Sequence, residues 1–118
     1  MKQLEIIYLD DAQSDLASVI NTFVTEIHAE SSYPWEDADT CEPIEPNVSE
    51  LLMSVIADIT AAVDADHIGR QDKDLPWHDG LTVSLADAVI RIFDIAGGLD
   101  LDLGGALIEK LVHNSKTK

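Results

Sequence analysis

The chain has 118 residues, of which 46% are hydrophobic, and this is enough for one compact domain with a core. Its 23 acidic and 7 basic residues give a net charge of −16, which disfavours nucleic acid and anionic membranes as partners. Such a surface suits a divalent cation or is simply solvated. The single cysteine, Cys41, excludes an intrachain disulfide, and the sequence shows no membrane span and no signal-peptide pattern, so we expect a cytoplasmic protein.

Two helices are predicted in the first half of the chain. Residues 1–9 are predicted as a short strand or a lead-in turn. Apolar residues then recur three and four apart over about 11–30, which is the period of an amphipathic helix. Three prolines prevent a continuous helix over 31–47, and the helical spacing resumes over about 48–67. The prolines are Pro34, Pro43 and Pro46, and the core stripe predicted for the second helix is Leu51, Leu52, Val55, Ile56, Ile59 and Val63.

Two more helices are predicted in the second half, after a polar loop over about 68–79. The third helix covers about 80–96 and ends at a pair of glycines, which readily adopt the left-handed cap conformation. Two further glycines lie in the first turn of the fourth helix and weaken it by about 1 kcal/mol each relative to alanine. Residues 115–118 are expected to fray. The first glycine pair is Gly97 and Gly98, the second is Gly104 and Gly105, and the fourth helix opens at Asp100 or Asp102.

The fold expected from this pattern is a single all-α domain over residues 1–118, arranged as a four-helix bundle. No strand-like alternation of useful length follows residue 10. The third helix is apolar on more than half of its circumference, and one small monomer can hardly cover such a surface. We therefore expect homo-oligomerisation, with a second copy completing the bundle across a two-fold axis.

Polar side chains follow one face of the third helix, inside a segment otherwise suited to burial. They are Ser84, Asp87, Arg91 and Asp94. A carboxylate on such a face is costly unless it is paired or coordinates a cation, so Asp87 needs a partner, and a metal ion is one candidate. Asp94 lies two turns from Asp87 on the same face, where it either adds to this site or pairs with Arg91.

Two segments of the chain carry a likeness to a known family. One comprises LADAVIRIFD over 85–94, Ala96-Gly97, Leu101-Asp102-Leu103, Ile108-Glu109-Lys110 and Asn114, and the other is VIADITAAVD over 55–64. They resemble the second half and the first metal helix of MazG-like nucleotide pyrophosphohydrolases. The resemblance covers about 48–116 and is looser over 1–47. It implies an all-α dimer or tetramer that hydrolyses nucleoside triphosphates to monophosphates and pyrophosphate with Mg²⁺, or alternatively Mn²⁺.

The family's signature is two acidic pairs, Glu-x-x-Glu on one helix and Glu-x-x-Asp on the next. Residues three apart share a helical face, and two such faces place carboxylates around Mg²⁺, which prefers oxygen ligands. In this chain the first pair aligns with Asp58 and Ala61, and the second with Ser84 and Asp87. The resemblance thus implies Asp58 and Asp87 as catalytic metal ligands, with Asp94 as a further candidate ligand.

The resemblance also implies substrate contacts on the last helix. Lys110 and Asn114 fall where the family has a lysine and an asparagine near the nucleotide, so Lys110 would meet a phosphate and Asn114 the base or sugar. Their spacing alone is equally that of a solvent-facing lysine and a helix cap. Trp35 lies in a loop beside a proline, where it either stacks on a nucleobase or covers the apolar end of the bundle.

Three functional hypotheses follow. The first is a Mg²⁺-dependent nucleoside triphosphate pyrophosphohydrolase with a house-cleaning role in the nucleotide pool. The second is a MazG-like nucleotide-binding or assembly protein with weakened or lost catalysis, because Ala61 and Ser84 replace two expected acids. The third is a helical module without a ligand, in which Asp58 and Asp87 form surface or interface pairs.

Overall fold

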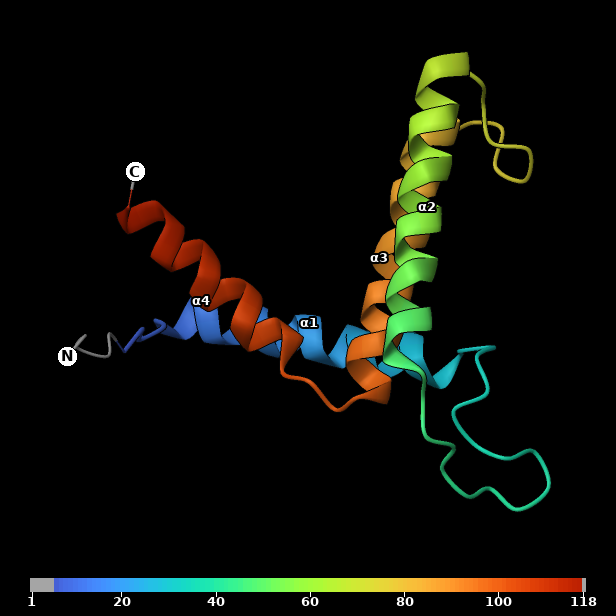
Figure 1. The fold of residues 1–118 in the computed structure, drawn as a ribbon. Helices are drawn as coiled ribbons and strands as arrows, with labels where there is room; N and C mark the ends of the chain where they lie inside the picture. The colour runs from blue at the N-terminus through green and yellow to red at the C-terminus, as the bar shows by residue number, and fades with distance from the viewer. Residues whose placement is uncertain (1–5, 118) are drawn as a thin grey trace.

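The computed structural model describes residues 6–117 and contains four helices and no strand over that range (Figure 1). This confirms the all-α class. Residues 6–10 have no regular structure, and the remainder of the segment expected to be a strand or turn lies outside the described residues. The helices are α1 (Asp11–Ala29), α2 (Val48–Ile68), α3 (Gly80–Gly98) and α4 (Leu103–Lys116).

Each helix begins at a side chain suited to capping. An aspartate or asparagine oxygen accepts a hydrogen bond from the backbone N–H three residues further along, which satisfies one of the free donors of the first turn. The capping residues are Asp10, Asn47, Asp79 and Asp102. The structure corrects two predicted ends: α3 continues through Gly97 and Gly98, and α4 continues through Lys116 instead of fraying at 115.

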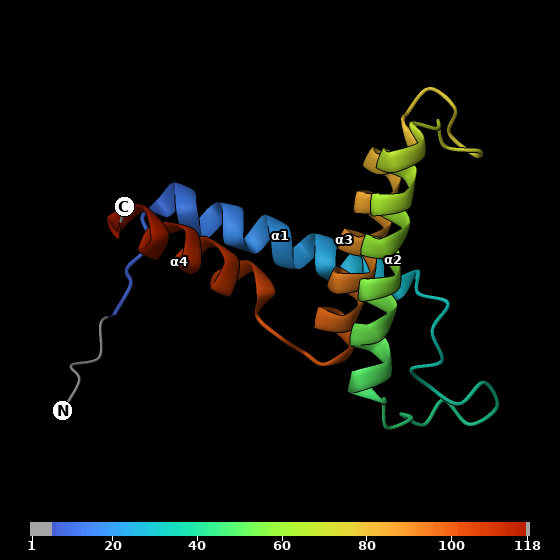
Figure 2. The same cartoon turned by 45° about the horizontal axis from the view of Figure 1, so that its top comes forward.

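The helices form two arms that diverge from a common corner (Figures 1 and 2). In the α2–α3 arm the two helices pack as an antiparallel hairpin, and in the α1–α4 arm they also run side by side in opposite directions. The arms meet where α1 packs against α3. No helix in the described part of the chain is long and apolar enough to cross a membrane.

Small residues hold α2 and α3 close together. A Cβ on Gly80 would lie 3.0 Å from the Cβ of Ala65, and Ala62 and Ala88 are also buried. The larger aliphatic side chains lie on the outer faces, which corrects the predicted core stripe of the second helix: only Leu51 of that stripe is buried. Exposed aliphatic residues include Leu52, Ile56, Ile59 and Val63 on α2 and Leu85, Val89 and Ile92 on α3.

A close backbone approach joins α4 to α1. A Cβ on Gly104 would collide with the carbonyl oxygen of Ala17, so this glycine permits the contact. The Gly104 N–H donates to Asn21 Oδ1 at 2.8 Å, and Asn21 Nδ2 donates to Asp102 Oδ1 at 2.7 Å. The glycine that weakens the isolated helix is therefore required where the helix packs.

Replacing Gly104 with alanine tests this contact, because helix propensity and the close contact predict opposite changes in the free energy of unfolding. Helix propensity alone would stabilise the protein by up to about 1 kcal/mol. Because the added methyl group meets backbone rather than a flexible side chain, we expect a net loss of about 1–3 kcal/mol in the free energy of unfolding. Denaturant unfolding followed by circular dichroism measures it, and a more stable variant would contradict the packing of α4 on α1.

Candidate functional site

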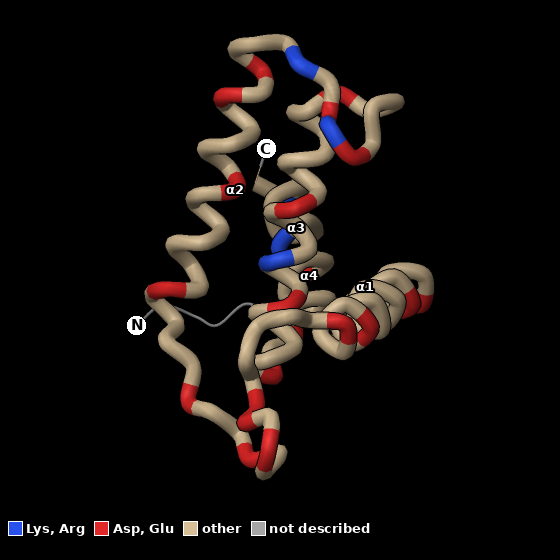
Figure 3. The backbone as a smooth tube through the Cα atoms, turned by 90° about the vertical axis from the view of Figure 1, so that its right-hand side faces the viewer, with Lys and Arg blue, Asp and Glu red and all other residues tan. Residues whose placement is uncertain are grey.

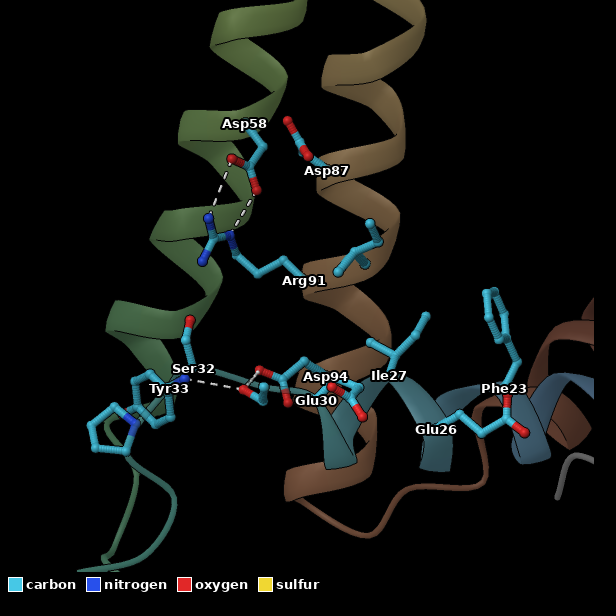
Figure 4. A pocket seen from close by; sticks show the side chains of 13 residues that line it. Phe23, Glu26, Ile27, Glu30, Ser32, Tyr33, Asp58, Asp87, Arg91 and Asp94 are labelled. Carbon is cyan, nitrogen blue, oxygen red and sulfur yellow. Dashed lines mark hydrogen bonds and ion pairs between the residues drawn. The ribbon is translucent and has the colours of Figure 1, made fainter. Parts of the chain in front are cut away.

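A pocket of about 920 Å³ lies in the corner where the end of α1 meets the α2–α3 arm (Figure 4). Among the described residues, five carboxylates and one guanidinium line it, together with apolar and loop residues. Acidic residues also outnumber basic ones in the chain as a whole (Figure 3). A negative pocket of this kind attracts cations and repels bare phosphates. The charged residues are Glu26, Glu30, Asp58, Asp87, Asp94 and Arg91.

The two predicted metal ligands both line this pocket. Asp58 lies on the same face of α2 as the buried Leu51 and Ala62, and its side chain is only 17% exposed. Asp87 lies at the edge of α3 and is exposed. Figure 4 shows both carboxylates in the space between α2 and α3. The spacing of these helices thus brings together two acids that are 29 positions apart in the sequence.

Asp58 is paired with Arg91 of the neighbouring helix. Arg91 Nε donates to Asp58 Oδ2 at 2.7 Å, and Nη2 donates to Oδ1 at 3.4 Å. This hydrogen bonding raises the pKa of Arg91 above its ordinary value. The sequence left open an ion pair between Arg91 and Asp94 on one helix. In the structure Arg91 instead forms its ion pair with Asp58, across the contact between α2 and α3.

The negative charge of Asp87 is less well compensated than that of Asp58, which is paired with Arg91. Although Asp87 is exposed, the protein atoms around its carboxylate remove some of its solvation and raise its pKa, and the negative charges of Asp58 and Asp72 raise it further. Arg91 opposes this effect but is hydrogen-bonded to Asp58. A cation placed between the two aspartates would relieve the repulsion, and this is the electrostatic condition that favours a metal ion.

Asp94 has a different role, because three donors converge on its carboxylate. His28 Nδ1 lies 2.8 Å and Trp35 Nε1 lies 3.0 Å from Oδ1, and Ser31 Oγ donates to Oδ2 at 2.6 Å. Only 14% of the Asp94 side chain is exposed. We call this group the Asp94 cluster. These bonds connect α1 and the following loop to α3, and they engage both oxygens of Asp94, the further metal ligand that the sequence suggested, which lines the same pocket.

The ring of Trp35 packs against protein rather than facing the pocket. It makes edge contacts with His28 and Tyr33, with ring centroids 5.3 and 4.7 Å away, and a Cβ on Gly98 would collide with the indole. Trp35 therefore covers the end of α3, which was the second of its two predicted roles. This contact also explains why the last residue of α3, position 98, is a glycine.

Lys110 and Asn114 lie away from the two aspartates. They are exposed on α4, which packs against α1, and neither residue lines the pocket (Figure 1). Within a single chain, therefore, Lys110, the predicted phosphate contact, does not line the same pocket as the two predicted metal ligands.

The pocket offers few donors that could hold Mg²⁺. Ala61 and Ser84 bring no carboxylate, and within residues 6–117 no three His, Cys, Asp or Glu side chains converge tightly enough to hold a metal. Mg²⁺ is commonly bound by one or two carboxylates, with waters and substrate phosphates completing its octahedron. Asp58 and Asp87 fit a site of this open kind.

Sequence reasoning missed the partners of these acids. The polar face of α3 was visible, and it does carry the pocket. However, no sequence spacing indicated His28 and Ser31 as partners of Asp94, because they lie 66 and 63 positions away and meet it only in the folded chain. Arg91 was visible as a neighbour of Asp87, but its long side chain reaches a different helix.

Comparison of the chain with protein-family models, with curated proteins and with solved structures found no match. The resemblance to MazG-like proteins accordingly stands on the residues alone.

Replacing Asp94 with alanine tests the Asp94 cluster. Three donors lose their common acceptor, so we expect a loss of about 2–3 kcal/mol in the free energy of unfolding. The emission of Trp35 should shift to longer wavelength as its indole becomes more solvated. Unfolding curves and tryptophan fluorescence measure both effects. Asp64→Ala, at an exposed position of α2, is the control and should change neither; equal behaviour of the two variants would contradict the cluster.

Proposed function

We propose that this protein is a MazG-like, Mg²⁺-dependent enzyme that hydrolyses nucleoside triphosphates to monophosphates and pyrophosphate. The observation that carries the proposal is the position of Asp58 and Asp87, which line one pocket from two packed helices. The sequence likeness, which does not depend on this geometry, assigns the same two residues as ligands. The pKa of Asp87 is raised first by desolvation and then by the negative charges of Asp58 and Asp72, and a cation bound between the two aspartates would offset this repulsion.

The chemistry of the pocket favours a metal-bound substrate. Five carboxylates repel a free triphosphate, so the phosphates need a cation in order to enter. Bound magnesium supplies charge neutralisation and an activated water. Asp58 and Asp87 would hold it, while Phe23 and Tyr33 offer aromatic surface to the nucleobase in the same pocket.

A second candidate is a MazG-like protein that binds nucleotides but has weak catalysis or none. Two observations favour it: Ala61 and Ser84 provide no carboxylate, and Arg91 already neutralises Asp58. Removing ligands from a metal site lowers the electrostatic stabilisation on which phosphoryl chemistry depends. Such a protein would retain triphosphate binding and assembly.

Release of pyrophosphate distinguishes these candidates. The protein is incubated with each common nucleoside triphosphate and Mg²⁺ or Mn²⁺, and pyrophosphate is measured. We expect turnover that Asp87→Asn reduces by about 100-fold or more, since metal clamping is lost. Asp64→Asn, a matched change on the exposed side of α2, should leave turnover unchanged. Thermal stabilisation by triphosphate without turnover indicates the binding protein. If turnover and stabilisation are both absent, the protein is a helical module without a ligand.

Homo-oligomerisation forms part of the proposal. The accessible surface is 8932 Å², whereas a compact monomer of 12.9 kDa has about 6,300 Å². The radius of gyration is 17.4 Å, against about 13.5 Å for a compact domain of this length. The surplus of about 2,600 Å² per copy, or about 5,200 Å² for a pair, lies at the upper end of the total area buried in obligate dimers, and exposed aliphatic residues contribute to it. A second copy seated on the outer faces of the α2–α3 arm would cover them.

An oligomer also offers a place for the predicted substrate contacts. Lys110 and Asn114 lie outside the pocket of their own chain, so their contact with a nucleotide requires α4 of another copy. A two-fold axis would supply this contact twice, once for each pocket.

Sedimentation velocity tests the oligomer. We expect wild type to sediment as a dimer or tetramer. Ile56→Gln should weaken the association by at least about tenfold, because it places an amide in the centre of the apolar face. Ile68→Gln is the matched control: Ile68 is 69% exposed but lies off the stripe formed by Leu52, Ile56, Ile59 and Val63. A monomeric wild type would contradict the proposal.

A further inference from the structure

We propose that Arg91 is a displaceable internal cation, which pairs with Asp58 in the free protein and transfers to substrate phosphates when a divalent metal binds. The inference rests on the proposed metal site and adds a coupling between the binding of the metal ion and the binding of the substrate phosphates. It concerns Arg91, to which neither the sequence likeness nor the acidic signature gives a role.

The geometry of the pair allows Arg91 to leave. One of its two hydrogen bonds is short, at 2.7 Å, and the other is long, at 3.4 Å. The Arg91 side chain is 43% exposed, whereas that of Asp58 is 17% exposed. The guanidinium therefore lies on the solvent side of the pair. It can turn away without opening the contact between α2 and α3, while Asp58 stays in place.

The charges around Arg91 make it a substitute for a metal ion. It is the single basic side chain lining the pocket, and the charges of Asp58, Asp87 and Asp94 all act on it. Its hydrogen bonds engage both oxygens of Asp58. A divalent ion that takes Asp58 as a ligand must compete for those same oxygens, so metal and guanidinium exclude one another there.

A freed Arg91 remains beside the pocket because its backbone belongs to the middle of α3, which packs against both α2 and α1. Its planar fork of donors suits phosphate oxygens, and it carries the positive charge that a triphosphate otherwise lacks in this site. Phosphate binding in turn draws Arg91 away from Asp58 and leaves that carboxylate available to the metal. Each ligand thus raises the affinity for the other, and thermodynamic linkage makes the two effects equal.

The test measures two affinities on the full chain, with Mn²⁺ as the metal probe and inorganic tripolyphosphate as the phosphate probe. In Arg91→Gln we expect Mn²⁺ alone to bind about tenfold more tightly, because a competing charge beside the ion is gone. With Mn²⁺ saturating, tripolyphosphate should bind about tenfold more weakly, because a charged hydrogen-bond donor is lost. Titration calorimetry and the electron paramagnetic resonance signal of free Mn²⁺ give both constants.

Arg70→Gln is the matched control, since it removes the same charge from the loop after α2 and should change neither affinity. Circular dichroism verifies folding. Arg91→Lys keeps the charge without the fork, so it should shift both constants in the same directions by less, and it serves as the test variant if Arg91→Gln does not fold.

The outcomes separate this inference from the proposed function. If wild type and the Arg91 variant bind Mn²⁺ equally, or the variant binds it more weakly, Arg91 is no competitor and the inference is wrong, although the metal site stands. If tripolyphosphate affinity is unchanged in the variant, transfer to phosphate is likewise refuted. If neither protein binds Mn²⁺ with or without tripolyphosphate, the metal site itself is absent and both proposals fail together.

Discussion

The position of the pocket depends on the hydrogen bonds accepted by Asp94. Three donors from the end of α1 and the adjoining loop converge on this one carboxylate of α3. They determine how the α1–α4 arm meets the α2–α3 arm, and the pocket lies in that corner. A charged group with so little exposure is stable there because its acceptor capacity is used. The loop and the indole of Trp35 are held by the same group.

One polar face of α3 therefore serves three purposes. Asp94 joins structural elements, Arg91 neutralises an acid of the neighbouring helix, and Asp87 is left with excess negative charge. The three residues lie on one helical face, four and three positions apart, but their surroundings differ. Because burial and available donors decide the role of each group, a shared face does not imply a shared function.

Much of the fold could be predicted from the sequence, because its determinants are local. Capping by residues such as Asp102 and the helical spacing of apolar residues located all four helices to within a few positions. The choice of packing face could not be predicted for α2, which is apolar on two sides. The sequence favoured Ile56 as a core residue, whereas the contact with α3 uses alanines, which approach more closely. An apolar pattern does not distinguish a face that packs within the chain from one left free.

The candidate site was predictable in part for the same reason. Asp58 and Asp87 were found through a likeness between segments, and the pocket unites them. The partners of Asp94 lie 59 to 66 positions away in the sequence, and no local spacing records such distances. Arg91 was considered with the acids on its own helix, but the length of its side chain lets it reach across to Asp58.

The contact of Gly104 with α1 has a consequence for biosynthesis. It joins residues 83 positions apart, whereas α2 and α3 are neighbours in the chain and need only a short loop between them. Closing the longer segment costs more conformational entropy, so the α2–α3 hairpin is the unit able to form early. The ribosome delivers α1 first and α4 last of the four helices. During translation α1 must wait for its partner with the surface around Ala17, which α4 approaches in the folded chain, still uncovered, and such uncovered surface promotes aggregation of a nascent chain.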